Sequence, residues 1–238
     1  MWHPPTESAP NDIRPATTDG PCRFAPAGLD ISLDHVLRVQ GYARPAKVRP
    51  AIRATAESVV LLATKIVTPT VHYRRRRIVE HGNDRLRLDD GAVFTCPAFD
   101  RHMADCVEVA IYVMTLGGGV DRIARNLIAD EQLLEAVILE AAGWIAIEGT
   151  TRAFTHHLRA EAALRGLEPA RRMSPGYGFR IKGTKAQWSL EEQKILFESL
   201  DSASLPVQLL ESCAMIPKMS RSGLFGLRPR DAAANRPA

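Results

Sequence analysis

The sequence has few of the residue patterns that mark whole classes of proteins. Its four cysteines (Cys22, Cys96, Cys106 and Cys213) lie far apart, without the close spacing of metal ligands, so we expect reduced thiols and no metal site. Aromatic residues make up 6% of the chain and do not alternate with the basic runs. No nucleic-acid-binding motif is present, so we expect no nucleic-acid partner.

Long apolar runs and targeting signals are also missing. No apolar run approaches the ~20 residues that a membrane-spanning helix needs. The first residues, 1–5, have neither a basic segment nor an apolar segment of the kind found in secretory signals. Together with the cysteine pattern, these absences predict a cytoplasmic protein with no membrane partner.

What is present fits an ordinary globular protein. The 238 residues are 45% hydrophobic and 24% charged, with a net charge of +4 and a pI near 9.0. A mildly basic surface favours a solvated face or an acidic protein partner. Binding of nucleic acid or another anionic surface is a third hypothesis, based on Arg74–Arg77 and on the basic residues of 180–185.

Composition divides the chain into a folded part and two tails. Six prolines lie among small polar residues before position 28, too few apolar groups to offset chain entropy, so 1–28 is predicted to be a flexible tail. Residues 29–227 form the predicted domain, and 228–238 a flexible C-terminal tail. Within the domain, apolar periodicity predicts helices over 32–41, from Pro45 or Ala46 to about 63, 120–127, 130–165 and 190–200.

Strand signals lie between these helices. β-branched and apolar runs predict strands over 67–80, 86–88, 92–95 and 106–116, and short strands between turns over 207–227. The run 106–116 is almost continuously apolar and is typical of a buried central strand. The fold class is therefore α+β, with a mixed, largely antiparallel sheet and long helices.

One short segment has the composition of a ligand-binding turn. Pro175-Gly176 is turn chemistry, because proline fixes φ and glycine permits positive φ. Arg172 can present a planar guanidinium to a carboxylate, and Tyr177 offers a flat, amphipathic ring. Ser174 completes the segment. The competing structural interpretation is an ordinary turn with a surface tyrosine.

A second segment follows about forty residues later. It runs Leu210-Glu211-Ser212-Cys213-Ala214-Met215-Ile216-Pro217, and Ser220-Arg221-Ser222-Gly223 comes directly after it. Glu211 has two interpretations, positioning of a ligand or local structure. The serines are also common turn formers.

In this order, the two segments resemble the activation domain of cobalamin-dependent methionine synthase. That family has an Arg-x-x-x-Gly-Tyr element around S-adenosylmethionine and then Thr-Glu-Ser-x-x-Met-x-Pro, with Leu210 here in place of the threonine. Weaker similarity covers Val113–Gly117 and the helix that carries Glu148. The resemblance implies a stand-alone domain with the activation-domain fold over roughly residues 29–227.

The resemblance also implies a site. Arg172, Ser174, Pro175, Gly176, Tyr177, Glu211 and Ser212 would bind S-adenosylmethionine, with Tyr177 and Glu148 nearest the chemistry. Glu148 would stabilise the sulfonium; its competing interpretation is an exposed helix carboxylate. No metal is expected in the chain itself. It has no Asp-x-His-x-x-Gly motif, so cobalamin would be carried by a partner.

Two functions follow from this resemblance. In the first, the protein is a methyltransferase component or reactivation factor that reductively methylates a corrinoid bound to a partner methyltransferase. It would then need an electron donor such as flavodoxin or ferredoxin. In the second, it is a non-catalytic docking or cap subunit of a corrinoid-dependent methyltransferase or demethylase system linked to tetrahydrofolate. The departures at Leu210 and in the basic loop 179–187 motivate the second function.

Overall fold

The computed structural model describes residues 20–181 and 183–230, and its centre is an antiparallel sheet. The strand order is β4-β3-β2-β5-β11-β6, with β1 also paired to β2. The strands of this sheet are β1 (Cys22–Phe24), β2 (Thr70–Gly82), β3 (Arg85–Leu88), β4 (Val93–Thr95), β5 (Glu108–Thr115), β6 (Leu167–Met173) and β11 (Ser220–Pro229). Two hairpins lie outside it, β7 (Gly178–Ile181) with β8 (Thr184–Gln187) and β9 (Gln208–Leu209) with β10 (Met215–Ile216).

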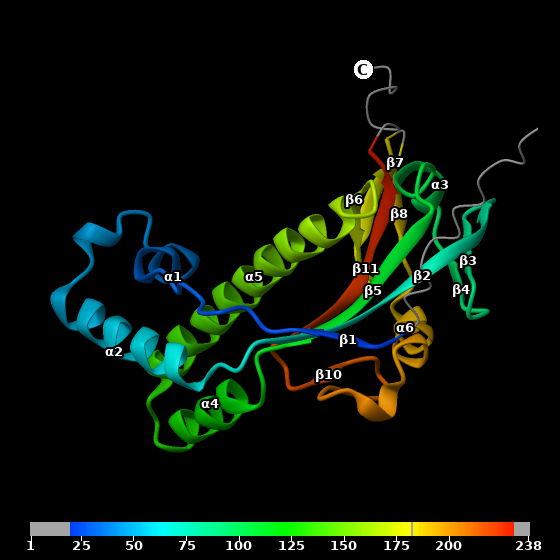
Figure 1. Ribbon diagram of the computed structural model, residues 1–238. Coiled ribbons are helices and arrows are strands. Elements are labelled where there is room, and N and C mark those ends of the chain that lie inside the picture. Colours follow the sequence, from blue (N-terminus) through cyan, green and yellow to red (C-terminus); the bar gives the residue numbers. More distant parts are fainter. Residues whose placement is uncertain (1–19, 182, 231–238) are drawn as a thin grey trace, which may run out of the picture.

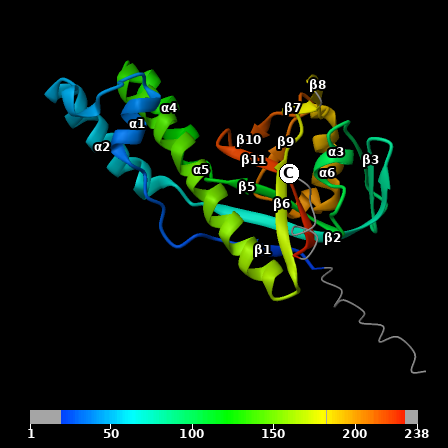
Figure 2. The same ribbon diagram turned by 90° about the horizontal axis from the view of Figure 1, so that it is seen from above.

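Helices cover both faces of this sheet (Figures 1 and 2). The helices α1, α2 and α4 lie around the N-terminal half of the long helix α5, at one end of the molecule. Helices α3 and α6 lie on the face of the sheet opposite α5. The helices are α1 (Leu33–Val39), α2 (Pro50–Ile66), α3 (Phe99–His102), α4 (Gly119–Ala129), α5 (Leu133–Ala163) and α6 (Gln193–Ser199). Short 3-10 turns occur at Pro45–Lys47, Leu190–Glu192 and Ser202–Ser204. The predicted α+β class and antiparallel sheet are confirmed.

Strand β5 separates two hydrophobic cores, as its continuous apolar run predicts. All eight of its residues are buried. Tyr112 and Met114 pack in the core under the long helix, whereas Ile111 and Val113 pack in the core on the opposite face. This alternation follows from the two-residue period of a strand, and it gives the sheet two buried faces.

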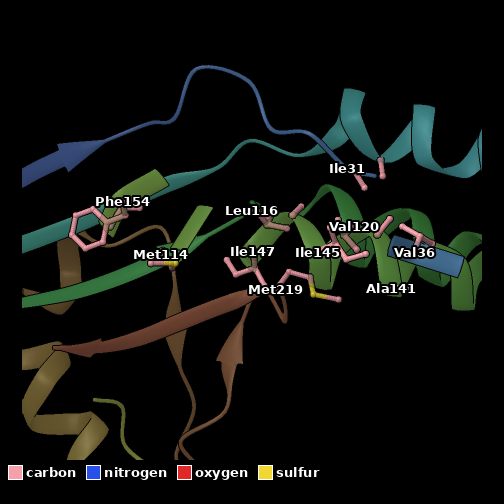
Figure 3. Close-up of a cluster of buried hydrophobic side chains, with 14 of the residues drawn as sticks. Ile31, Val36, Met114, Leu116, Val120, Ala141, Ile145, Ile147, Phe154 and Met219 are labelled. Carbon is pink, nitrogen blue, oxygen red and sulfur yellow. The ribbon is translucent and has the colours of Figure 1, made fainter. Parts of the chain in front are cut away.

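The first core joins the helical end to the sheet. Figure 3 shows Met114 and Leu116 of the β5 region packing against Ile145 and Ile147 of α5. Met219, which precedes β11, fits against Gly143, where a Cβ atom would lie 3.1 Å from the Met219 Cε. The absence of a side chain at Gly143 therefore allows close packing at this point. It fixes the segment before β11 against the middle of α5.

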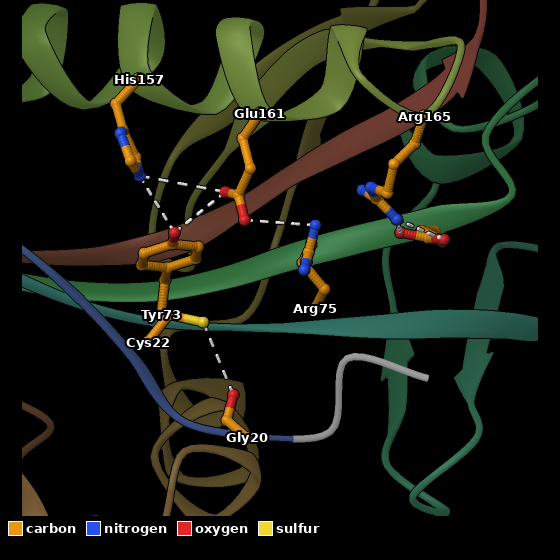
Figure 4. Close-up of polar contacts among 8 residues, drawn as sticks. Gly20, Cys22, Tyr73, Arg75, His157, Glu161 and Arg165 are labelled. Carbon is orange, nitrogen blue, oxygen red and sulfur yellow. Dashed lines mark hydrogen bonds and ion pairs between the residues drawn. The ribbon is translucent and has the colours of Figure 1, made fainter. Parts of the chain in front are cut away.

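Polar contacts tie the second half of α5 to β2 (Figure 4). The Tyr73 hydroxyl donates to Oε2 of Glu161 over 2.9 Å, and its oxygen lies 3.1 Å from Nε2 of His157. Arg75 forms an ion pair with Glu161 at 3.3 Å, and Arg165 forms one with Glu108. This network holds α5 at a fixed position on the sheet.

The four consecutive arginines alternate between the two faces of β2, which follows from the two-residue period of a strand. Arg75 meets Glu161 on the α5 side, and Arg76 forms an ion pair with Asp90. Arg77 lies 3.4 Å from Asp89, and Arg74 donates to the backbone oxygen of Ser199. Within the described residues, this basic run therefore makes contacts inside the molecule. Fewer of these arginines are therefore available to bind nucleic acid or another anionic surface, as the third hypothesis requires.

Several boundaries differ from those predicted. β1 lies inside the segment 1–28 that composition predicts to be a tail, and β11 runs to Pro229, past the predicted boundary at 227. Residues 1–19 and 231–238 of the predicted tails lie outside the described residues. The second helix begins at Pro50, because a 3-10 turn occupies Pro45–Lys47. Residues 220–229 form one long strand, not several short ones, because they pair with both β5 and β6.

The glycine run 117–119 serves close packing. A Cβ atom on Gly117 would collide with Oγ1 of Thr68, and one on Gly119 would lie 2.5 Å from the backbone oxygen of Ile66. These glycines therefore allow β5 to turn into α4 against the end of α2. No helix among the described residues is long and apolar enough to cross a membrane.

Candidate functional site

A cavity of about 340 Å³ lies where the two sequence segments meet the long helix. Its walls come from the middle of α5, from the turn after β6, and from the chain between the β9–β10 hairpin and β11. Its volume is within the range of small-molecule sites. The lining residues are Trp144, Ile147, Ser174, Pro175, Tyr177, Leu190, Gln193, Cys213, Ala214, Met215, Lys218, Met219, Ser220, Arg221 and Ser222.

The first wall is the turn that follows β6. The Tyr177 N–H donates to the Ser174 carbonyl oxygen over 3.3 Å, and Gly176 has φ of +82°. Proline followed by a glycine of positive φ is the residue order of a type II turn. Ser174 and Pro175 are buried, but the Tyr177 ring is 53% exposed at the mouth of the cavity. The turn predicted from Pro175-Gly176 is confirmed.

A buried tryptophan fixes the position of this turn. The Gly176 N–H donates to the Trp188 carbonyl oxygen over 2.8 Å, and the Trp188 N–H donates to the Tyr177 carbonyl oxygen over 3.2 Å. The Trp188 ring is fully buried, and its Nε1 donates to Glu192 over 2.6 Å. The loop 179–187 between these residues is the β7–β8 hairpin. Its strand pairing therefore holds the turn rigidly beside the cavity.

The second wall begins at the tip of the β9–β10 hairpin. Leu210 N–H donates to the Ala214 carbonyl oxygen over 2.9 Å, which closes the tip, and Cys213 has a φ of +62°. The buried Gln193 of α6 donates from Nε2 to the Cys213 carbonyl oxygen over 3.2 Å. These bonds point the backbone of 213–215 toward the cavity. Glu211 and Ser212 are exposed at the tip and are not among the lining residues.

The third wall contains a nearly buried ion pair between α5 and β11. Nη2 of Arg221 donates to Oε1 of Glu148 over 2.7 Å, and Nη1 donates to Oγ1 of Thr151 over 3.2 Å. The hydrogen bond from Arg221 lowers the pKa of Glu148, although burial opposes this. Burial alone would lower the pKa of Arg221, but the hydrogen bond and charge of Glu148 raise it overall. Both groups are therefore held charged.

Arg172 lies beside this ion pair, on the edge strand β6. Its positive charge is close enough to lower the pKa of Glu148, and it also acts on the buried hydroxyl of Tyr112. Burial raises the pKa of Tyr112, and Arg172 partly offsets that rise. In the described part of the chain, Arg172 Nη1 and the Tyr112 hydroxyl are buried without a hydrogen-bond partner of good geometry. Such orphaned polar groups are uncommon in folded proteins, so each of them calls for a structural or functional explanation.

A glycine makes this dense arrangement possible. A Cβ atom on Gly223 would collide with the Met173 carbonyl oxygen and with Oγ of Ser174, and it would lie 3.0 Å from the Tyr112 hydroxyl. Gly223 of β11 is paired with Tyr112 of β5. The motif Ser220–Gly223 therefore places Arg221 in the cavity wall and lets three strands come together behind it.

The structure brings together most of the residues predicted from the sequence. Ser174, Pro175 and Tyr177 line the cavity, and Gly176 forms the turn between them. Arg172 and Glu148 are not among the lining residues, and Glu148 is joined to the cavity wall through its ion pair with Arg221. Glu211 and Ser212 project at the hairpin tip instead. Their roles in ligand binding stay predictions.

Sequence reasoning missed four lining residues of clear chemical character, namely Trp144, Gln193, Lys218 and Arg221. Trp144 is 48% exposed in the structure, but the sequence gives no signal that distinguishes it from the buried apolar residues on either side. Arg221 lies inside the predicted Ser-x-Ser-Gly element, but its partner Glu148 is 73 residues away. No local pattern reveals a pair that distant.

His157 is not among the residues that line this cavity. His157 contacts Tyr73, and its ring stacks on Phe24 at 4.4 Å. Residues 20–181 and 183–230 contain no group of three or more side chains that could together bind a metal ion. The four cysteines form no disulfide in the structure.

Comparisons with known proteins identify the fold. No protein-family model matches the sequence, and no curated protein matches it. A solved structure of the MetH reactivation domain bound to AdoHcy matches with a TM-score of 0.56 and 16% sequence identity. The match covers 89% of this chain and 79% of that chain. The chain thus shares the fold of that domain over nearly its whole length.

Proposed function

We propose that the protein binds S-adenosylmethionine in the cavity and acts as a reactivation component for a corrinoid carried by a partner protein. The observation that carries the proposal is the convergence of two separate sequence elements, 172–178 and 213–223, on one cavity beside Arg172 and Arg221. The fold is that of a reactivation domain bound to AdoHcy, the demethylated form of the same compound.

The residues at the cavity fit the parts of this ligand. Arg221 lines the wall and Arg172 lies next to it with an orphaned buried donor, so the two can hold a carboxylate by charge-assisted hydrogen bonds. Trp144 and Tyr177 offer exposed aromatic faces to an adenine ring or a corrin. Ile147 and Met215 supply apolar contact.

S-adenosylmethionine supplies a methyl group on a sulfonium when it is bound. The role of the protein is to orient that group and to exclude water around it. The rigid turn at Ser174–Tyr177 and the anchored segment at Met219 define the two sides of the cavity, so the ligand is held between fixed walls. Methylation would trap a corrinoid that a flavodoxin or ferredoxin has just reduced, a step that is otherwise uphill.

An alternative is a docking or cap subunit in a corrinoid-dependent methyltransferase or demethylase system. The hairpin β7–β8 supports it, because Arg180 and Lys185 are direct cross-strand partners and both are exposed. Like charges opposite one another destabilise a hairpin, and an acidic partner would relieve that repulsion. In this case the corrinoid protein would bind, but S-adenosylmethionine would not.

Titration calorimetry of the purified chain with S-adenosylmethionine tests the proposal. We expect saturable binding, with and without a cobalamin-binding protein present. Absence of binding under both conditions would remove the proposed function. Capture of a cobalamin-binding protein together with silent calorimetry would favour the docking alternative.

A further inference from the structure

The cavity wall has an uneven balance of charge. Two cations, Lys218 and Arg221, line it, and no aspartate or glutamate does so among the described residues. Lys218 forms an ion pair with Glu140 at 2.6 Å. Arg221 is likewise paired, with Glu148, but its side chain is 12% exposed against 64% for Lys218, so water screens the charge of Arg221 less.

The carboxylate that would balance the site is paired with Arg221 and is not among the lining residues. Glu148 is bound to Arg221 at 2.7 Å, and two further arginines, Arg152 and Arg172, are close enough to act on it. Three arginines therefore act on one carboxylate, and Arg221 is the one in direct contact with it. The Arg221 side chain is 12% exposed and the Glu148 side chain 29%, so water screens these charges only partly.

This arrangement of charges disfavours the binding of a ligand that carries a positive sulfonium. A carboxylate in the cavity lining would attract the sulfonium, but the lining contains Arg221 and not Glu148, and Arg221 repels a cation. An uncharged thioether of the same shape avoids the repulsion and keeps its contacts with the arginines through its carboxylate. Such a charge difference, at partly buried sites, changes affinity by roughly 10-fold.

We infer that the cavity prefers the thioether S-adenosylhomocysteine over the sulfonium S-adenosylmethionine, and that Arg221 determines this preference. The inference rests on the proposed function. It further specifies that the site selects the uncharged form of the ligand. It also bears on methyl transfer to a nucleophile. When the C–S bond breaks, both electrons stay on sulfur and the repelled positive charge disappears, so the site favours the direction of transfer.

Paired calorimetric titrations test the inference. The full chain is titrated separately with S-adenosylhomocysteine and S-adenosylmethionine, and the ratio of the two Kd values is compared among variants. We expect the wild type to bind the thioether roughly 10-fold more tightly. In Arg221→Gln, which removes the cation from the cavity wall and leaves Glu148 without its partner, the ratio should fall to near one or invert. In Glu148→Gln, which leaves the arginines unbalanced, preference for the thioether should increase.

Arg228→Gln is the matched control. Arg228 lies on the same strand β11 and forms an ion pair of the same length, 2.7 Å, with Glu168, away from the cavity. It should leave the ratio unchanged. A wild type that prefers the sulfonium, or an equal loss of both ligands in Arg221→Gln, overturns the inference while the proposed function survives. If neither ligand binds the wild type, the proposed function fails, and the inference fails with it.

Discussion

Arg221 of β11 and Glu148 of α5 form a 2.7 Å ion pair at the wall of the cavity. The pair joins the last strand of the sheet to its longest helix at the point where the two motif segments meet. It therefore has two expected effects. It stabilises the fold, and it sets the charge that a ligand encounters.

The first prediction concerns acid stability. The pKa of Glu148 is lowered in the folded state, so its contribution is complete above its ordinary pKa of 4.5 and is lost as the pH falls through the lowered value. Glu148→Gln should reduce the free energy of unfolding by about 1–2 kcal/mol at pH 7, and the difference should shrink below pH 4. Urea unfolding at several pH values measures this. The exposed Glu211→Gln should change little, and a pH-independent loss in Glu148→Gln would contradict the ion-pair account.

The second prediction separates Arg172 from its neighbour. Arg172→Ala should weaken S-adenosylmethionine binding by about 2–4 kcal/mol, the cost of a lost charge-assisted contact. Its stability should change little, since Nη1 has no partner to lose within the described chain. Arg171→Ala, which removes an exposed side chain over the Phe179 ring, should cost well under ~1 kcal/mol of binding. Titration calorimetry measures the loss of binding free energy in both variants. Equal losses would indicate diffuse electrostatic attraction and not a specific contact with Arg172.

The third prediction concerns the glycine behind the site. Gly223→Ala places a methyl group against the Met173 carbonyl and Ser174 Oγ, so it should destabilise the fold by about 1–3 kcal/mol. Gly178→Ala is the control, because its nearest neighbour is the Ala186 carbonyl oxygen at 3.8 Å. Thermal unfolding of the two variants tests the difference. Equal melting temperatures would show that the strands behind the cavity have room to separate.

The fourth prediction concerns the exposed tryptophan. Trp144→Ala should weaken binding of S-adenosylmethionine by about 1–2 kcal/mol and leave stability nearly unchanged, because Trp144 is 48% exposed at the cavity. Leu164→Ala, at the exposed end of α5, provides a control for removing surface apolar area. Fluorescence titration of the wild type and calorimetry of the variants measure the effect. A loss of stability with full binding would make Trp144 a packing residue.

Local patterns predicted much of the fold. The continuous apolar run identified β5, and helical periodicity identified α5, because each element buries a face whose period can be seen in the sequence. The segment 207–227 was expected to contain short strands between turns, but residues 220–229 form the single strand β11. Its strand structure comes from pairing with β5 and β6, which are distant in sequence.

The features of the site were also only partly predictable from the sequence. The Pro175-Gly176 turn was predictable, because its φ requirements are local to the two residues. The ion pair between Glu148 and Arg221 was not, because it forms only when α5 and β11 pack together. The exposed placement of Glu211 likewise depends on the hairpin that closes around it.

A crystal structure of the protein soaked or grown with S-adenosylmethionine tests the central claim most directly. The account predicts ligand density in the cavity between Trp144 and Tyr177, with the carboxylate of the ligand within hydrogen-bond distance of Arg172 or Arg221. Density at another place on the molecule, or an empty cavity at saturating ligand, would contradict it.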